Sequence, residues 1–404
     1  MNHRVTVSKM VARQRARVAA LAAGRHVLAI QDTSEINYEA QRERKRGLGT
    51  VGNGSDVGLF VHPVLAVDAD TGHGLGLLDV QVWRRFKGKA KNYRKLPIED
   101  KESYRWIKGP QRVKAAMAKA TMITVIDDRE GDIYEKWARL PDRRVHLLTR
   151  AGRDRSVADG GSLFATMAGF AERHRFKLDL PARPGKRQAR KASLTVRFGR
   201  VRICRPKSCS DPDAPRELEL FAIEVRELNP PAGEPPILWR LLTTHEVENV
   251  AQALTVIGWY RQRWNIEQLF RTVKTQGLGI EQSVMEDGAA LEKLAVIALI
   301  GAAMTMQLVL ARAAADRPAA EVFDDRQLRV LEALQARLQG STSKQQNPHP
   351  PKTLAWAAWT IARLGGWSGY ESERSAGPIT MRDGLQRFNA IVQGYFLDED
   401  VCPC

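Results

Sequence analysis

The spacing of apolar residues predicts alternating strands and helices over the first 150 positions of the chain. A short apolar run at 26–32 ends in an acid and is typical of a buried strand. Two β-rich runs, 59–67 and 75–83, are joined by a polar segment containing glycine, which predicts a hairpin. A helix around 110–120, a strand at 122–126, a helix near 132–140 and a strand at 145–149 are expected next. This order predicts an α/β fold with a mixed sheet.

Beyond residue 151 the pattern changes to the alternation of apolar and polar positions that strands show. Strand candidates lie at 194–198, 201–203, 217–225 and 237–243, with a turn rich in proline and glycine at 229–236. Helical patterns dominate from 248 to about 338, and a polar, proline-rich linker follows at 340–351. A last helix at 354–364 is expected to end at Gly365 and Gly366.

These patterns divide the chain into four parts. We expect a basic N-terminal helix at 1–25, an α/β core at 26–150 and 244–312, a β-rich insertion at 151–243, and a helical C-terminal region at 313–404. The apolar stretch 294–311 is long enough to be considered as a membrane span, but it contains Thr305 and Gln307 and is rich in small residues. A helix buried between other elements is the preferred interpretation.

Composition and charge narrow the class of protein. With 43% hydrophobic and 27% charged residues in 404, the chain is neither disordered, collagen-like nor a disulfide scaffold. Its 63 Lys and Arg exceed its 46 Asp and Glu, which gives a net charge of +17 and favours a polyanionic partner. Nucleic acid is the leading candidate and an anionic membrane the second. Acid-free basic stretches precede Asp32 and recur at 84–95 and 183–205.

Cysteine and histidine usage points to no structural metal or disulfide framework. The four cysteines are too few and too unevenly spaced for a disulfide scaffold, which favours a reducing cytoplasm. The eight histidines are scattered, so a structural zinc site is not expected. The basic N-terminus is followed at 18–23 by a short, weakly apolar run, and no export signal is predicted.

The segment 259–274, WYRQRWNIEQLFRTVK, contains the closest grouping of candidate functional residues. On a continuous helix with about 100° per residue, one acid, three cations and a tyrosine share a face, opposite an apolar side. These five are Tyr260, Arg263, Glu267, Arg271 and Lys274. The alternative is a solvated face in which Glu267 forms ion pairs with its i±4 neighbours Arg263 and Arg271.

Further acids stand at predicted strand ends, where α/β proteins usually bind ligands. Asp32 ends the first strand, and either Asp127 or Asp128 ends the strand at 122–126. Together with Glu267 they would supply three hard oxygen ligands, which suit Mg²⁺ or Mn²⁺ rather than zinc. Two such ions could activate a water or a 3′-hydroxyl and stabilise the departing oxygen of a phosphodiester. For any one strand-end aspartate, the alternative is a turn-forming cap.

The spacing Tyr260-x2-Arg263-x3-Glu267-x6-Lys274 follows two other motifs, Ile30-Gln31-Asp32-Thr33 and Asp128-Arg129-Glu130-x-Asp132-Ile133. This set resembles the DDE transposases of the Tn-five type within the IS-four insertion-sequence family. The similarity continues through 189–194, 228–233, 251–254 and 361–366 and covers nearly the whole chain. It implies an RNase H-like core with a mixed central sheet flanked by helices, a β-rich insertion subdomain and a helical C-terminal domain.

The resemblance also assigns roles to individual residues. It selects Asp128 over Asp127, so that Asp32, Asp128 and Glu267 form a catalytic triad for two Mg²⁺ ions, with Mn²⁺ as a possible substitute. Tyr260, Arg263 and Lys274 match positions that hold DNA phosphates near the cleaved transposon end, and Arg271 takes the place of another basic contact. Trp239 matches a residue that stacks on a flipped base. We also expect Arg190, Lys191, Arg197 and Arg200 of the insertion to face DNA phosphates, the alternative being a solvated β-ribbon.

The expected function is DNA transposition, with cleavage at transposon ends through a hairpin intermediate and strand transfer into target DNA. We expect a homodimer on DNA, joined by the C-terminal helices after residue 351, in a cytoplasmic bacterial protein that is associated with the nucleoid when DNA-bound and with no membrane. Family members usually carry a further N-terminal domain that recognises the transposon end, and this domain is expected to be missing. The alternatives are an N-terminally truncated, non-catalytic inhibitor of transposition and a metal-dependent nuclease.

Overall fold

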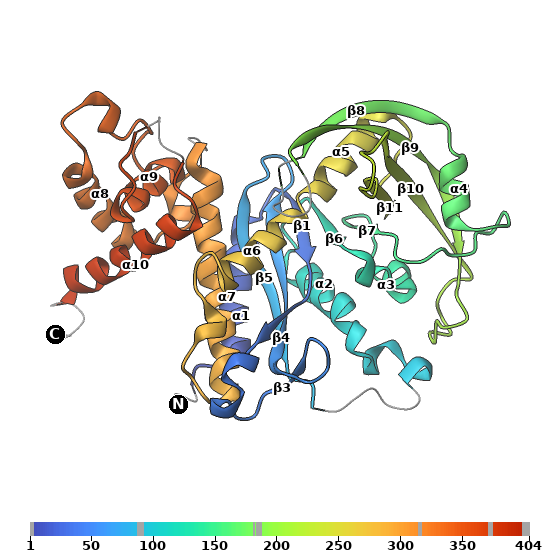
Figure 1. The fold of residues 1–404 in the computed structure, drawn as a ribbon, viewed down its shortest axis with the longest axis horizontal. Helices are drawn as coiled ribbons and strands as arrows, with labels where there is room; N and C mark the ends of the chain where they lie inside the picture. Colours follow the sequence, from blue (N-terminus) through green and yellow to red (C-terminus); the bar gives the residue numbers. More distant parts are fainter. Residues whose placement is uncertain are drawn as a thin grey trace. The chain divides into compact units, whose positions relative to one another are not determined.

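The computed structural model describes residues 4–86, 93–180, 182, 188–313, 317–370 and 375–397. Its chain forms two compact units that interleave along the sequence (Figure 1). The first unit comprises 1–21, 33–86 and 265–404, and the second comprises 22–32 and 87–264. The four-part division expected above stays a prediction.

The second unit is built on a mixed sheet. Strands β1 (His26–Gln31), β6 (Met122–Asp127) and β7 (Val145–Arg150) run parallel, and their central residues are buried. Antiparallel strands continue the sheet in the order β11 (Leu238–Thr243), β10 (Glu217–Leu228), β9 (Arg190–Cys204) and β8 (Glu172–Leu180). The mixed α/β prediction is therefore confirmed, and this sheet is compatible with an RNase H-like transposase fold.

Strand β8 was not predicted, although its sequence carries the signal. Phe176, Leu178 and Leu180 alternate with exposed polar residues along this strand, as the period of two requires.

Helices of the second unit are α2 (Arg105–Ala116), α3 (Tyr134–Arg139), α4 (Leu163–Gly169) and α5 (Val250–Arg261). Helix α2 begins five residues before the predicted start, with Pro110 inside it. Asn249 and Gln252 form a reciprocal capping box at the start of α5.

The first unit contains an antiparallel sheet centred on β4 (Asp56–Asp68), which pairs with β2 (Ser34–Asn37), β3 (Gly49–Val51) and β5 (Gly74–Trp83). The predicted hairpin between the β4 and β5 runs is confirmed, and Asp68 caps its turn through Oδ1, which accepts from two backbone N–H groups. The predicted N-terminal helix is α1 (Val7–Leu21), which packs on β5. Its Arg15 forms an ion pair with the buried Asp79.

A helical core completes the first unit. It joins α8 (Asp325–Leu338), α9 (Leu354–Leu364) and α10 (Pro378–Tyr395) around Phe323, Trp356 and Phe388. The predicted helix 354–364 is confirmed at both ends. Two glycines let the helices approach closely, because a Cβ at Gly384 would lie 1.9 Å from the Ile361 carbonyl oxygen and one at Gly365 would lie 2.0 Å from that of Thr380.

Helix α7 (Gly288–Leu310) is long and apolar enough to cross a membrane by length and composition, with a mean hydropathy of 2.0 over its most apolar window. More than half of that window is buried, and α7 packs against β5, α9 and α10 within the first unit. This burial is what the core helix of a globular unit shows, and it agrees with the buried helix predicted at 294–311. Among the described residues it is the sole helix that passes this test.

The expectation of one continuous helix through 259–274 is wrong. Helix α5 ends at Arg261, a two-residue turn follows, and α6 (Trp264–Lys274) begins. Within the turn, the N–H groups of Gln262 and Arg263 bond to carbonyls three residues earlier, at 3.0 Å each. On a continuous helix, the face that α5 buries around Tyr260 would stand about 180° from the face that α6 buries around Leu269. The break allows both apolar faces to be buried.

Three histidines meet inside the second unit. Thr124 Oγ1 lies 2.8 Å from His26 Nε2 and 2.7 Å from His245 Nε2. The rings of His146 and His245 stack with centroids 4.1 Å apart, and Trp259 packs against His245 at 4.8 Å. Burial, with the neighbouring histidines, lowers the pKa of His245 to about 3. The folded state therefore holds this imidazole neutral.

The histidine cluster predicts acid sensitivity of the fold. Above pH 6.5 His245 is neutral in both states, whereas between pH 6.5 and about 3 only the unfolded chain protonates it. The free energy of unfolding should therefore fall by about 1.4 kcal/mol per pH unit from this residue as the pH drops through that window. Urea denaturation at pH 7.5 and pH 5 checks this, with His245→Gln as the comparison. An equally steep loss in the variant would contradict the assignment.

Candidate metal and DNA-binding site

Asp32 and Asp128 follow the carboxyl ends of two neighbouring parallel strands. Strands β1 and β6 pair in register up to Ile30 opposite Ile126, and each strand ends one residue later. Because neighbouring strands lie about 4.8 Å apart, the main chain of Asp32 leaves the sheet beside that of Asp128. The two carboxylates therefore stand at the sheet edge where α/β proteins bind ligands.

Asp127 and Asp128 differ in their surroundings, and this difference bears on which of them could bind a metal, a choice that local sequence reasoning left open. Asp127 is fully buried, and its carboxylate accepts hydrogen bonds from Gln31, Thr149 and Lys136. Asp128 is half-buried, and its Oδ1 is buried without a hydrogen-bond partner among the residues that the structure describes. Asp127 is thus used internally, whereas Asp128 keeps an oxygen available for a ligand. The turn after them needs Gly131, where a Cβ would lie 2.5 Å from that of Asp127.

Three further predicted site residues lie near these acids in the second unit. Arg263 Nη1 lies 3.2 Å from Asp32 Oδ2, so the turn between α5 and α6 supplies a cation to the first aspartate. Tyr260 is buried, and this burial, with the negative charge of Asp128, raises its pKa to about 12 against the opposing effect of Arg263. The half-buried ring of Trp239, on β11, packs against Tyr260 with centroids 6.2 Å apart. Tyr260 therefore stays a neutral hydrogen-bond donor.

The other three residues of the predicted stripe belong to the first unit, on α6. Glu267 lies in the first turn of the helix and is half-buried. Arg271 and Lys274 follow on the same face, opposite the buried Ile266, Leu269 and Val273, as predicted for this part of the segment. Lys274 Nζ lies 3.5 Å from a Glu281 carboxylate oxygen, which compensates part of its charge.

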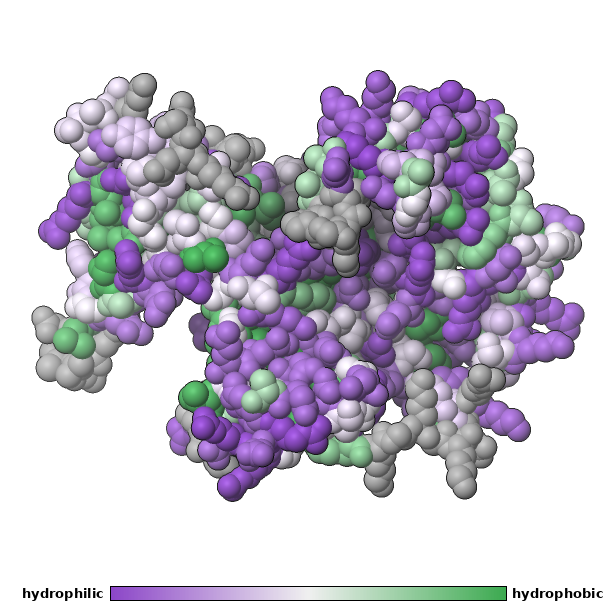
Figure 2. Space-filling model, in the orientation of Figure 1, coloured by the Kyte–Doolittle hydropathy of each residue, from purple (hydrophilic) through white to green (hydrophobic). Residues whose placement is uncertain are grey.

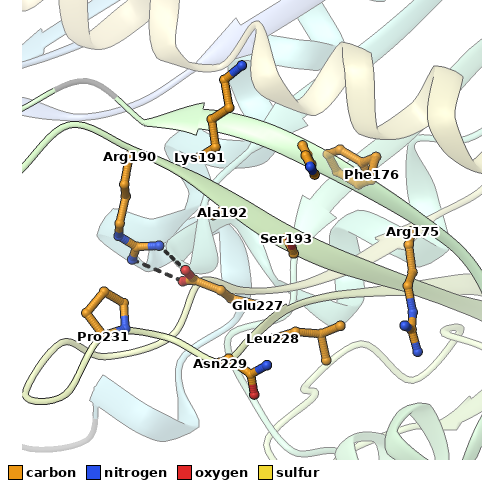
Figure 3. A pocket seen from close by; sticks show the side chains of 11 residues that line it. Arg175, Phe176, Arg190, Lys191, Ala192, Ser193, Glu227, Leu228, Asn229 and Pro231 are labelled. Carbon is orange, nitrogen blue, oxygen red and sulfur yellow. Dashed lines mark hydrogen bonds and ion pairs between the residues drawn. The ribbon is translucent and has the colours of Figure 1, made fainter.

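The four predicted basic residues of the insertion lie on β9, and acids from elsewhere in the fold compensate most of their charge. Arg190 forms ion pairs with Glu227 and Glu234, as Figure 3 shows for Glu227. Arg200 forms ion pairs with Glu219 and Glu248. Arg197 donates to the Ala168 carbonyl, and the exposed Lys191 lies 3.9 Å from Asp179. The stretch therefore contains no acid in the sequence, but in the folded chain acids from other segments lie beside several of its basic residues.

A pocket of about 560 Å³ lies beside Arg190 between β8, β9 and the turn after β10. Its walls carry Arg175, Lys177 and Lys191, and the ion pair of Arg190 with Glu227 spans it (Figure 3). Arg173, Arg175 and Lys177 alternate along the exposed face of β8, where hydrophilic residues dominate the visible surface (Figure 2). These cations were not predicted, although their spacing of two residues within a strand pattern indicates one exposed basic face.

The second basic stretch, 84–95, is only partly described. Lys87, Lys89 and Lys91 lie outside the described residues. Arg84 forms an ion pair with Glu292 at 2.7 Å, and the Arg85 guanidinium lies over the Phe60 ring at 4.4 Å. Arg84 and Arg85 therefore have internal partners in the first unit.

The donor chemistry of the two aspartates fits a hard divalent cation. Asp32 and Asp128 offer carboxylate oxygens at one edge of the sheet, and Oδ1 of Asp128 is buried with no hydrogen bond to another described residue. Over the described ranges, however, no three histidine, cysteine or acidic side chains gather in an arrangement that could hold a metal ion. Carboxylate oxygens suit Mg²⁺ or Mn²⁺ among biological cations.

Comparison with known proteins finds a family whose model matches part of this chain. Residues 128–304 match the model of the family described as "Transposase DDE domain". The match covers less than half of the chain, and it includes Asp128 and Glu267 but begins after Asp32.

A solved structure described as "Cryo-EM structure of piggyBac transposase synaptic complex with hairpin DNA (SNHP)" aligns at 8% identity and a TM-score of 0.36. The alignment covers 91% of this chain but 57% of the other, and a likeness at this level carries no argument about the fold. The family match supports a DDE transposase, an enzyme class that cleaves and joins DNA with divalent metal ions.

Proposed function

We propose that this protein is a DNA transposase of the Tn-five type within the IS-four family, which cleaves DNA at transposon ends and transfers the strands into target DNA. One observation carries the proposal: Asp32 and Asp128 directly follow adjacent parallel strands, and Asp128 keeps a buried oxygen with no hydrogen-bond partner in the described part of the chain. The family match across Asp128 and Glu267 supports it. The hairpin intermediate, the target preference and the family within the DDE class are part of the proposal.

In this proposal Asp32, Asp128 and Glu267 hold divalent cations, Mg²⁺ or Mn²⁺. When bound, such ions lower the pKa of an attacking hydroxyl and neutralise charge on the phosphodiester. Arg263 orients the Asp32 carboxylate, to which its Nη1 is already close at 3.2 Å, and its positive charge attracts a DNA phosphate. Tyr260 donates a hydrogen bond from its phenol O–H to a phosphate oxygen, because the phenol stays protonated to about pH 12.

The remaining proposed contacts hold the DNA in place. Arg271 and Lys274 bind phosphates along the exposed face of α6, and each such contact adds salt dependence rather than sequence readout. Trp239, half-buried beside Tyr260, stacks on a base displaced from the transposon end. We also propose that two copies of the chain bring two ends together through their C-terminal helices.

A strand-transfer assay tests this function. A labelled duplex that carries the terminal inverted repeat of the element is incubated with the protein, target plasmid and Mg²⁺. Joined products are expected, and their absence with cleavage retained would identify the nuclease alternative. Binding of the duplex with neither cleavage nor joining would identify the non-catalytic inhibitor.

The ion pairs of the insertion lead to a prediction about DNA affinity. Replacing Arg173 and Lys177 of β8 by glutamine should weaken DNA binding and reduce the slope of log K against log[salt] by up to about 2, because each phosphate contact releases counterions. Replacing Arg190, whose guanidinium is engaged by two acids, should leave the slope unchanged. Fluorescence anisotropy between 50 and 200 mM salt measures both. A larger slope change for Arg190→Gln than for the β8 variant would contradict this assignment.

A further inference from the structure

Directly beneath the two strand-end aspartates lies a buried polar cluster formed by Gln31, Asp127, Lys136 and Thr149. All four side chains are fully buried. Gln31 Nε2 donates to Asp127 Oδ1 at 2.6 Å, and Thr149 Oγ1 donates to Asp127 Oδ2 at 3.0 Å. Lys136 Nζ donates to Thr149 Oγ1 at 3.1 Å and forms an ion pair with Asp127. Asp127 is therefore the centre of the cluster.

The members of the cluster come from four different elements. Gln31 closes β1, Asp127 closes β6, Thr149 lies near the end of β7, and Lys136 projects from α3. Thr149 lies opposite Asp127 in the strand register. Gln31 and Asp127 are the immediate chain neighbours of Asp32 and Asp128. The cluster thus ties the carboxyl ends of three parallel strands together, one residue before the proposed metal ligands.

Stability alone gives no reason for a charged pair at this place. Removing the charges of a lysine and an aspartate from water is strongly unfavourable, and an apolar pair of similar volume is often equally stable. Burial, with the positive charge of Arg155, lowers the pKa of Lys136, which shows how costly its charge is here. What the charged cluster provides and an apolar one would not is a set of directional bonds that fixes strand ends relative to one another.

We propose that Lys136 is a positioning residue that acts through Asp127 and Gln31 to set the separation of Asp32 and Asp128, and thereby the affinity for divalent cations. Lys136 holds Asp127 against Thr149, and Asp127 holds Gln31, so the main chains at 32 and 128 leave the sheet at a fixed spacing. This inference rests on the proposed function, in which these two carboxylates bind the cation.

The test measures Mn²⁺ binding to the full chain by calorimetry, beside the melting temperature without metal. Thr149→Val keeps the side-chain shape and removes two hydrogen bonds, and it should weaken Mn²⁺ binding about threefold to tenfold while the apo protein stays folded. The double variant Asp127→Asn with Lys136→Met leaves no unpaired buried charge, and it should weaken binding by about tenfold or more. The matched control is Glu224→Gln, which alters another buried carboxylate of the same sheet, paired with Arg226 and Arg240. It should lower the melting temperature but leave Mn²⁺ affinity unchanged.

Two results would overturn the inference and separate it from the function on which it rests. If the wild type binds Mn²⁺ and both cluster variants bind it equally well, the cluster is structural and the metal site stands without it. If the wild type binds no Mn²⁺ at millimolar concentration, the metal site itself is wrong, and the positioning role falls with it. A loss in Glu224→Gln as large as in the cluster variants would assign the effect to general destabilisation.

Discussion

Replacing Asp128 by asparagine is expected to abolish DNA cleavage and joining while the protein stays folded. An amide has the shape of the carboxylate but binds divalent cations poorly, so the rate should fall by at least about 10³, which corresponds to about 4 kcal/mol of transition-state stabilisation. The melting temperature should stay the same or rise, because one oxygen of the removed carboxylate is buried with no hydrogen-bond partner over the described ranges. Glu267→Gln should show the same loss of activity. The strand-transfer assay and a melting curve measure both quantities.

The neighbouring acid provides the matched control. Asp127→Asn changes the same atoms one residue away, but it leaves the ammonium of Lys136 buried without its counter-ion. Breaking such a buried pair costs about 3–5 kcal/mol, so this variant should melt at a clearly lower temperature. If Asp128→Asn destabilised the fold and kept activity, and Asp127→Asn did the reverse, the roles of the two acids would be exchanged.

Replacing Arg155 by methionine is expected to destabilise the second unit strongly. Arg155 and Asp132 are both buried, and Nη2 of the arginine lies 2.7 Å from Oδ1 of the aspartate. The carboxylate also accepts from Trp137 Nε1 at 3.2 Å and from the backbone of Gly152 at 3.0 Å. Without Arg155, Asp132 keeps a buried charge with no cation, which costs about 3–5 kcal/mol. Urea denaturation measures this loss.

The effect of Arg155 should exceed that of an exposed ion pair. Arg175→Met removes the pair with Glu172 on the surface of β8 and should change stability by less than about 0.5 kcal/mol. The double variant Asp132→Asn with Arg155→Met should recover part of the loss, because no unpaired charge remains. Equal stabilities of Arg155→Met and Arg175→Met would show that the buried pair contributes no more than the exposed one. The pair joins the loop after Asp128 to the start of the insertion segment.

Short-range pattern determined much of the fold. The apolar run of β1, the hairpin of β4 and β5, and helix α9 lie where the sequence predicts them. Each is set by neighbours a few positions away: alternation of side chains, a turn with glycine, or a capped apolar stretch. The predicted strand ends place Asp32 beside either Asp127 or Asp128, and the resemblance selects Asp128. That part of the site, reached from spacing together with the resemblance, stays a prediction.

Tertiary structure alone decided which side chains are engaged by internal partners. The turn after Arg261 exists because α5 and α6 bury opposite faces, which no local pattern in 259–274 shows. Arg190 and Arg200 stand in an acid-free stretch, yet acids brought by β10 and by the start of α5 compensate them. Asp127 and Asp128 are adjacent and chemically identical, and only the packing of Lys136 and Thr149 makes one internal and leaves the other available. Charge compensation depends on residues distant in sequence, so it is fixed by the fold rather than by the local sequence.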